Sequence, residues 1–392
     1  MRSIASAALA ALLLAATLPA DAGATEQTIW KIGIFDGSSG EFKSQDINYA
    51  DPKSDPVFVV GESRDKDWYR FQPGPANGMT GGRLHPFTVK FPLKDMPRGA
   101  YHLKIAILYE MPRLSFLKLE VNGHSGYFYF HPKLDFRAGD WEGTFVPQTS
   151  TDEKTISIPA AWLRKGENIF ILTAMDDPAT AQMSFGAIAP GHTGLIYDAL
   201  EFSQNDAAQY DSSAFSAQIE PTIFYRETTT GIAELVDVFI SASTLPSAGS
   251  VELRVAGHSF SRAFSTGNEF GEARIEFEVP EWSGPALAAV RLDKLSATAV
   301  KIEPAKKWTI DLIPHEHLDI GFTDYPAKVA ELHSQSIDQA MDLIKKTPDF
   351  RWTLDGSWVA DQYLNGRSSE ARQQFLEQVR DGSCLLYTSR CV

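Results

Sequence analysis

The chain has 392 residues, of which 43% are hydrophobic and 22% charged, a composition typical of globular rather than disordered proteins. At this length we expect two or three domains. The formal net charge of −14 argues against nucleic acid as a partner, because phosphate binding requires clustered Lys and Arg. Such a charge is compatible with a neutral ligand, although it does not require one.

Residues 1–24 have the pattern of a secretory signal peptide. Arg2 gives a positive start, residues 4–18 are apolar, and Ala20–Ala24 offers small residues to a signal peptidase. The alternative is a single membrane anchor, but this run is shorter than the roughly 20 apolar residues that a span requires. We therefore expect an exported protein, secreted or periplasmic, with no membrane segment after signal cleavage.

Residues 27–204 read as an all-β section. Apolar and β-branched segments of strand length recur, and turn signals such as Asn122-Gly123 and Lys165-Gly166 separate them. Long spacings between some segments favour a sandwich with elaborate loops. The predicted strands are Thr28–Phe35, Pro86–Phe91, Tyr101–Tyr109, Ser115–Val121, Lys154–Ile158, Asn168–Ala174 and Ile196–Phe202.

Residues 28–202 resemble the C-terminal β-sandwich of rhamnogalacturonan lyases. The motifs that carry the resemblance are Ile32–Gly37 followed by Glu41-Phe42, Leu119–Gly123, Gly166–Asn168 and Tyr197–Leu200. The resemblance implies a jelly-roll fold and carbohydrate binding. No lyase catalytic domain accompanies it, and because the jelly roll hosts many functions, the fold alone does not assign one.

Residues 205–305 form a second β-rich section. Four segments read as strands, and this number of strands in a section of about 100 residues is typical of a small immunoglobulin-like sandwich. No cysteine pair supports a true immunoglobulin domain. We expect this section, an immunoglobulin-like or linker domain, to serve for spacing or packing. The four segments are Glu234–Ala242, Ser250–Val255, Ala273–Val279 and Ala286–Leu292.

From residue 306 to residue 382 the pattern alternates between strand and helix. We expect a strand at Trp308–Ile313, a helix capped by Asp324 with Pro326 in its first turn, a strand at Phe350–Leu354 and a helix at Glu370–Arg380. This order is the start of an α/β domain with a parallel sheet. Because two strands cannot complete such a sheet, we expect the domain to be truncated.

The most informative constellation follows the first of these strands. In extended backbone, His315, His317 and Asp319 lie on one side, because side chains two residues apart point the same way. Parallel sheets bind ligands beyond the carboxyl ends of their strands. Imidazole and carboxylate groups are good zinc ligands, so the pattern is compatible with a metal site. The spacing alone is weak evidence for a metal site, since His-x-His also occurs by chance.

The segment PHEHLDIGFTDYP, residues 314–326, resembles the first strand motif of glycoside hydrolase family 38, the zinc-dependent α-mannosidases. The resemblance extends from Trp308 to Gly382 and implies His317 and Asp319 as zinc ligands, with His315 as a supporting residue beside the metal. The family's usual tryptophan is Phe322 here, which keeps an apolar surface for a possible sugar contact but loses the indole N–H.

The resemblance further implies a retaining glycosidase in which two carboxylates act and zinc holds sugar hydroxyls. Those carboxylates and the other zinc ligands lie further along the family's chain and have no counterpart here. Asp324, Asp355 and Asp361 do not match the motif and read as solvated or capping groups. We expect this fragment to be inactive and to bind zinc weakly or not at all.

Residues 383–392, with both cysteines at Cys384 and Cys391, fit nothing upstream and read as a non-native tail; the alternative is a genuine strand with a disulfide. The leading functional prediction is a secreted α-mannosidase-like protein with an appended carbohydrate-binding domain. The alternatives are a non-catalytic carbohydrate-binding protein of a pectin-degrading system and a structural β-sandwich protein without a sugar ligand.

Overall fold

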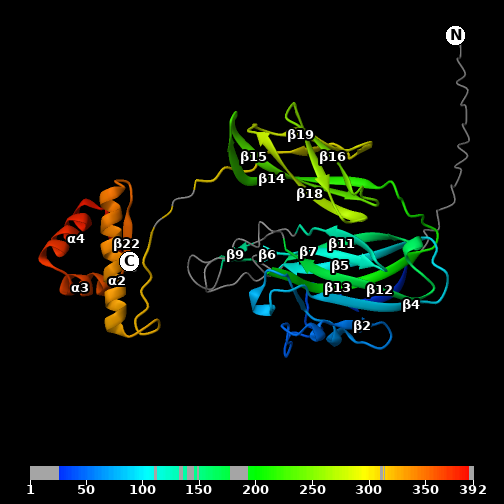
Figure 1. Cartoon of the computed structure of the whole chain (residues 1–392), viewed down its shortest axis with the longest axis horizontal. Helices are drawn as coiled ribbons and strands as arrows, with labels where there is room; N and C mark the ends of the chain where they lie inside the picture. Colours follow the sequence, from blue (N-terminus) through cyan, green and yellow to red (C-terminus); the bar gives the residue numbers. More distant parts are fainter. Residues whose placement is uncertain are drawn as a thin grey trace, which may run out of the picture. The chain divides into compact units, whose positions relative to one another are not determined.

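The computed structural model describes residues 26–109, 113–131, 136–138, 145–147, 150–176, 193–309, 312 and 314–387. The chain divides into two compact units, Met1–Lys306 and Lys307–Val392, which are described separately. Within these residues, the first unit is built mainly from β-strands, and the second combines short strands with three helices (Figure 1).

The first part of the first unit is a two-sheet sandwich. One sheet has the strand order β1-β13-β5-β11, with β3 and β6 also pairing with β13. Its strands are β1 (Gln27–Gly33), β3 (Phe71–Pro73), β5 (Ala100–Tyr109), β6 (Arg113–Leu114), β11 (Ser150–Pro159) and β13 (Thr193–Asn205). The facing strands run in the order β8-β7-β12-β4-β2. They are β2 (Val57–Val59), β4 (Pro86–Leu93), β7 (Phe116–Val121), β8 (His124–Phe128) and β12 (Gly166–Met175).

All seven strands predicted in this section are confirmed. Alternation of apolar and polar residues places every second side chain in the space between the sheets, as in the buried Phe87, Val89 and Phe91 of β4. At the centre, Phe91, Phe170 and Phe202 contact one another edge-on or tilted, with ring centroids 4.9–5.1 Å apart. Small elements outside the two sheets are the β9 (Phe136–Ala138) and β10 (Phe145–Pro147) pair and the 3₁₀ turns at Pro52–Ser54, Asp65–Asp67, Gly78–Thr80 and Ala160–Trp162.

The second part of the first unit is another β-sandwich with its own core. One layer contains β14 (Phe215–Thr228), β15 (Gly231–Ala242) and β18 (Phe270–Pro280). The other contains β16 (Ala248–Val255), β17 (His258–Ser265), β19 (Ala286–Leu292), β20 (Leu295–Ser296) and β21 (Val300–Ile302). The four predicted strands are confirmed. Strands β14 and β17 were not predicted, because most of their residues are exposed or half-buried and carry no clear apolar alternation.

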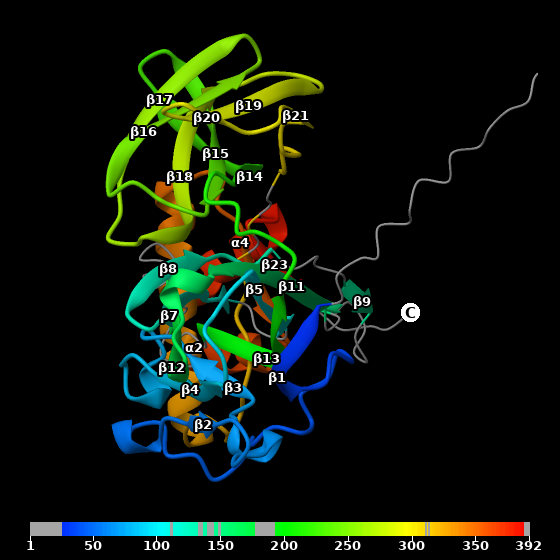
Figure 2. The same cartoon turned by 90° about the vertical axis from the view of Figure 1, so that its right-hand side faces the viewer.

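One sheet runs through both sandwiches. Its order is β14-β15-β18-β8-β7-β12-β4-β2, so a strand of the second sandwich pairs directly with a strand of the first (Figure 2). The link is a parallel pairing of Phe270 with Gly126 and of Gly271 with Tyr127. A Cβ on Gly126 would lie 2.7 Å from the Phe270 carbonyl oxygen, and one on Gly271, which has φ +90°, would lie 2.5 Å from the Tyr127 carbonyl oxygen. Glycine is therefore required on both strands.

Side chains reinforce this junction, which we define as the β8–β18 pairing and its immediate contacts. Phe270 is buried in the core of the first sandwich, with its ring centroid 4.7 Å from Trp162. The carboxylate of Glu272 accepts a hydrogen bond from the Tyr129 backbone N–H and pairs with the Lys154 ammonium group, each at 2.6 Å. Because Lys154 belongs to β11 and Tyr129 follows β8, Glu272 contacts both sheets of the first sandwich.

The second unit contains three helices and a short parallel sheet. The helices are α2 (Pro326–Lys346), α3 (Ser357–Gly366) and α4 (Ser369–Asp381). The strands are β22 (Trp352–Asp355) and β23 (Cys384–Tyr387), which pair in parallel. A small core that includes Met341, Leu354, Tyr363 and Phe375 holds the helices against these strands.

The predicted first helix, second strand and second helix are present as α2, β22 and α4, whereas the predicted first strand and the predicted cap of α2 require correction. Trp308, Thr309 and Leu312 are not in a strand; the extended pairing starts later, where His315 bridges Thr353 in parallel. The N-cap of α2 is Tyr325, with Pro326 in the first turn as expected, whereas the predicted cap Asp324 forms an ion pair with Lys328. Helix α3 was missed, because its short apolar pattern follows directly on the strand.

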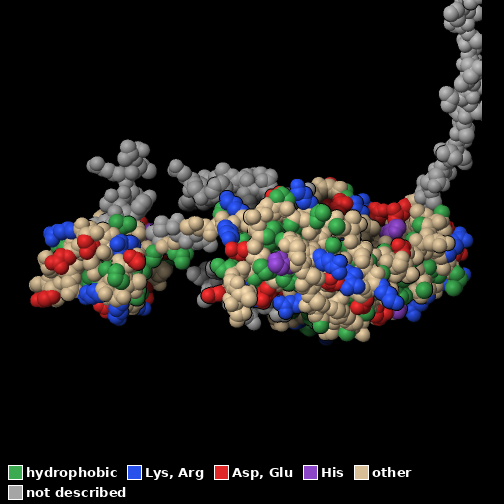
Figure 3. All heavy atoms as spheres, turned by 90° about the horizontal axis from the view of Figure 1, so that it is seen from above, with side chains coloured by type: hydrophobic (Ala, Val, Ile, Leu, Met, Phe, Trp, Pro, Cys, Tyr) green, Lys and Arg blue, Asp and Glu red, His purple; other side chains and the backbone are tan. Residues whose placement is uncertain are grey.

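No helix in the described part of the chain is both long and apolar enough to cross a lipid bilayer. On the molecular face drawn in Figure 3, acidic and basic side chains are interspersed rather than separated into patches of one sign.

The first prediction concerns the junction. We expect Gly271→Ala to lower the free energy of unfolding by about 1–2 kcal/mol from its positive φ, and by a further ~1–3 kcal/mol from the clash with the Tyr127 carbonyl. Gly257→Ala is the matched control, because Gly257 has φ +80° but no atom within 4 Å of the added Cβ. Urea unfolding of both variants measures the difference, and equal losses would contradict the close approach at the junction.

The second prediction concerns β23. Burial raises the pKa of the Cys384 thiol from its ordinary 9.0 to about 11, which leaves about 100-fold less thiolate at pH 8. In a Cys391→Ser variant, whose single thiol is Cys384, we expect iodoacetamide to react at least that much more slowly with the native chain than with the chain in urea. Equal rates would show that Cys384 is not buried between the helices and β22.

Candidate functional site

The predicted site residues lie at one end of the short parallel sheet of the second unit. The Thr353 backbone N–H donates to the Pro314 carbonyl at 3.0 Å, and the Glu316 N–H donates to the Thr353 carbonyl at 3.2 Å. These bonds hold the segment in extended form beside β22. Glu316 is therefore buried while His315 and His317 are exposed, as alternation requires.

Two of the predicted residues are brought together. His317 Nε2 lies 3.4 Å from Asp319 Oδ1, and His317 Nδ1 lies 3.8 Å from Asp355 Oδ2. Asp355 is the last residue of β22, so it emerges at the same end of the sheet as His317. The imidazole thus lies between two carboxylates, with 74% of its side chain exposed.

Behind this cluster, a buried pair holds the segment to α2. Glu316 contacts Nδ1 of His333, a residue of α2, and the other oxygen of Glu316 has no partner in the described structure. Loss of solvent raises the pKa of the Glu316 carboxyl group, although the His333 contact opposes that shift. The pair positions the backbone between His315 and His317, so it fixes where the exposed imidazoles emerge.

The other two predicted residues take no part in this contact network. His315 contributes its backbone to the bridge with Thr353, and its side chain is exposed. Phe322 is 86% exposed, next to the similarly exposed Tyr325. An exposed aromatic ring is available for a sugar contact, but the structure places no other predicted site residue against it.

The donors do not fit a complete zinc site. A catalytic zinc ion requires three protein ligands that converge on one point. Here the two carboxylates face opposite nitrogens of His317, so an ion bound by Nε2 and Asp319 would lie away from Asp355. Among the residues that the structure describes, no group of three His, Cys, Asp or Glu side chains is arranged to hold a metal ion.

Asp355 is the residue that sequence reasoning set aside. Its position at the end of a strand was visible in the sequence, but the parallel pairing that brings it to His317 was not. The signal that could have found it is the rule that ligand-binding groups gather at the carboxyl ends of neighbouring parallel strands.

The aromatic residues of the first sandwich divide into core and surface. Trp68 is fully buried and Phe128 is 5% exposed, so both belong to the core. Tyr127 and Tyr129 are half-buried on the opposite face of β8, and both contact Phe116, with ring centroids 5.1 and 5.0 Å apart.

The fold of the first sandwich agrees with a comparison of sequence families. Residues 28–202 match the family described as CBM-like, polysaccharide lyase family 4, domain III. This match confirms the predicted carbohydrate-binding-like jelly roll over the same residues. It ends before the second unit and gives no support to the resemblance of residues 308–382 to glycoside hydrolase family 38. No curated protein matches the chain.

Among solved structures, the chain is compared with enzymes of glycoside hydrolase family 2. The galacturonate-bound β-galacturonidase from Eisenbergiella tayi is 11% identical, with a TM-score of 0.22 over 78% of this chain and 50% of that one. Its glycerol-bound structure gives 11% and 0.20 over 56% and 35%. A member from Bacteroides cellulosilyticus gives 13% and 0.18 over 79% and 42%. The chain spans half or less of the length of these enzymes. TM-scores this low do not establish a shared fold or activity.

The third prediction concerns zinc. Because no three donor side chains converge on one point among the described residues of the site, we expect a zinc-binding free energy far smaller than the ~10–16 kcal/mol of structural zinc sites. Competition between the full chain and a chromophoric zinc chelator measures this affinity. Stoichiometric binding that is lost in His317→Ala, but kept in the control His258→Ala on the exposed strand β17, would contradict the expectation.

Proposed function

We propose that this protein binds carbohydrate through its first unit. The observation that carries the proposal is the match of residues 28–202 to a carbohydrate-binding-like domain of a polysaccharide lyase family, together with the two-sheet sandwich that those residues form. The net charge of −14 favours neutral over strongly acidic glycans, because like charges repel.

Two resemblances support two different classes of glycan as the ligand. The resemblance of the first sandwich to rhamnogalacturonan lyases supports a pectic ligand, in line with a non-catalytic protein of a pectin-degrading system. The resemblance of residues 308–382 to family 38 supports mannose-containing glycans. For the activity of the whole protein we prefer the resemblance to family 38, and we propose an α-mannosidase-like glycoside hydrolase with an appended binding domain.

A single observation favours the hydrolase as a second function. His317 and Asp319 lie 3.4 Å apart beside Asp355, the last residue of the parallel strand β22, and the carboxyl ends of such strands are where α/β enzymes place their ligands. The chain itself lacks a converging third donor among its described residues, so we propose that residues 307–387 do not catalyse hydrolysis by themselves. We also propose export, because residues 1–24 have the pattern of a signal peptide.

The fourth prediction tests both functions on one panel of polysaccharides. We expect the full chain to be retained on at least one neutral mannan or pectic polysaccharide in affinity electrophoresis, and to release no reducing sugar from any of them. A bovine albumin sample controls for non-specific retardation. Absence of retention on every polysaccharide would contradict the binding function, and robust sugar release would contradict the proposed lack of catalysis.

A further inference from the structure

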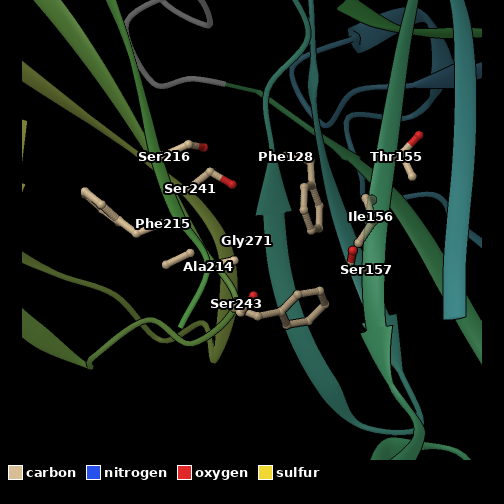
Figure 4. Close-up of a pocket in the computed structure, with 12 residues that line it drawn as sticks. Phe128, Thr155, Ile156, Ser157, Ala214, Phe215, Ser216, Ser241, Ser243 and Gly271 are labelled. Carbon is tan, nitrogen blue, oxygen red and sulfur yellow. The ribbon is translucent and has the colours of Figure 1, made fainter. Parts of the chain in front are cut away.

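A cavity of about 220 Å³ lies within the first unit, where the two sandwiches meet at the junction. Figure 4 shows that its walls come from strands far apart in the sequence. Strands β8 and β11 of the first sandwich form one side, and the start of β14, the end of β15 and the start of β18 form the other. Neither sandwich would form this cavity alone.

The lining combines aromatic rings with hydroxyl groups. Phe128 and Phe270 are both buried, with ring centroids 5.6 Å apart, and provide an apolar surface. Ser216 and Ser241 lie opposite each other on β14 and β15, and Ser157 lies across the cavity on β11. In Figure 4, Phe128 lies between the serine pair and Ser157.

The hydroxyl groups are available for a ligand. Within the part of the chain that the structure describes, Ser157, Ser216 and Ser241 make no side-chain hydrogen bond to protein, whereas Ser243 already donates to the Asp211 carbonyl at 2.7 Å. Each serine hydroxyl both donates and accepts, as the hydroxyl groups of a sugar do. The three available serines can therefore pair with neighbouring hydroxyls on one ligand.

Charge and size restrict the class of ligand. None of the described residues that line the cavity carries a charged side chain, so a carboxylate or phosphate would lose water there without gaining a cation. The volume is below the roughly 300–1,000 Å³ of pockets for drug-sized ligands, which leaves room for one ring rather than an oligosaccharide. An apolar ring face with polar edges matches this combination of rings and hydroxyls.

We propose that this cavity, the junction pocket, binds a single neutral sugar residue of a glycan, with Ser157, Ser216 and Ser241 pairing with its hydroxyls beside Phe128. The proposal rests on the proposed carbohydrate-binding function, and it specifies where the sugar binds and which class of sugar is preferred. Neutral sugars bind in preference to uronic acids, and binding requires the junction that brings the two sandwiches together.

In the experiment, the full chain is titrated with methyl α-mannoside, methyl α-rhamnoside and sodium galacturonate. Binding is measured by saturation-transfer NMR and by calorimetry. We expect a neutral glycoside to bind and galacturonate to bind more weakly. Ser216→Val and Ser241→Val should each lower affinity roughly two- to tenfold, the loss of one hydrogen bond. Ser296→Val, on an exposed strand position away from the pocket, should leave affinity unchanged.

The outcomes distinguish failure of the junction pocket from failure of the proposed carbohydrate-binding function. If the polysaccharide panel shows binding but the serine variants, with unchanged urea midpoints, bind as the parent does, the junction pocket is wrong and the carbohydrate function stands. Galacturonate binding as tightly as the neutral glycosides would also overturn the pocket assignment. If neither polysaccharides nor monosaccharides bind, the proposed function fails and the pocket assignment fails with it.

Discussion

The parallel approach of β18 to β8 is the constraint on which the first unit depends. Two glycines allow the backbones to come close, and the pairing joins one layer of each sandwich into one continuous sheet. The Glu272 carboxylate then ties β18 to both sheets of the first sandwich, through Lys154 and the Tyr129 N–H. Because the Glu272 side chain is only 11% exposed, removal of Lys154 would leave a largely buried charge short of its partner, which is strongly destabilising.

The junction changes how the second β-section is understood. The sequence predicted a role in spacing or packing, and a spacer alone would leave the carbohydrate-binding-like sandwich unaffected. Instead, Phe270 of the second section belongs to the first core, and its strand supplies part of a cavity wall. The second sandwich therefore contributes both to the stability of the first and to the shape of the surface available to a ligand.

Much of the local structure could be predicted from the sequence, because it depends on short-range pattern. The alternation in Ala100–Tyr109 gives β5, and Pro326 marks the start of α2. What could not be predicted depends on contacts distant in the sequence. Nothing near Gly126 indicates that Phe270 lies beside it, and nothing near Asp355 indicates His317. The short-range signal is weak for the mostly exposed β17, which was missed.

The second unit shows the same limit at its candidate site. The sequence predicted that His315, His317 and Asp319 lie on one side of the segment. In the structure His315 and His317 are exposed, and the buried Glu316 between them contacts His333 of α2. The metal was inferred from resemblance, and the arrangement of donors around His317 does not supply it. The proposed carbohydrate function therefore rests on the first unit, where residues 28–202 match a CBM-like family model and form a two-sheet sandwich.

The central claim is that the junction makes both sandwiches one cooperative structure. Hydrogen–deuterium exchange of the full chain at increasing urea, followed by mass spectrometry, tests it most directly. Peptides from β7–β8 and from β15 and β18 should lose protection together at one urea concentration. Loss of protection in β15 and β18 while β7 and β8 remain protected would show that the second sandwich unfolds independently, and would contradict the account.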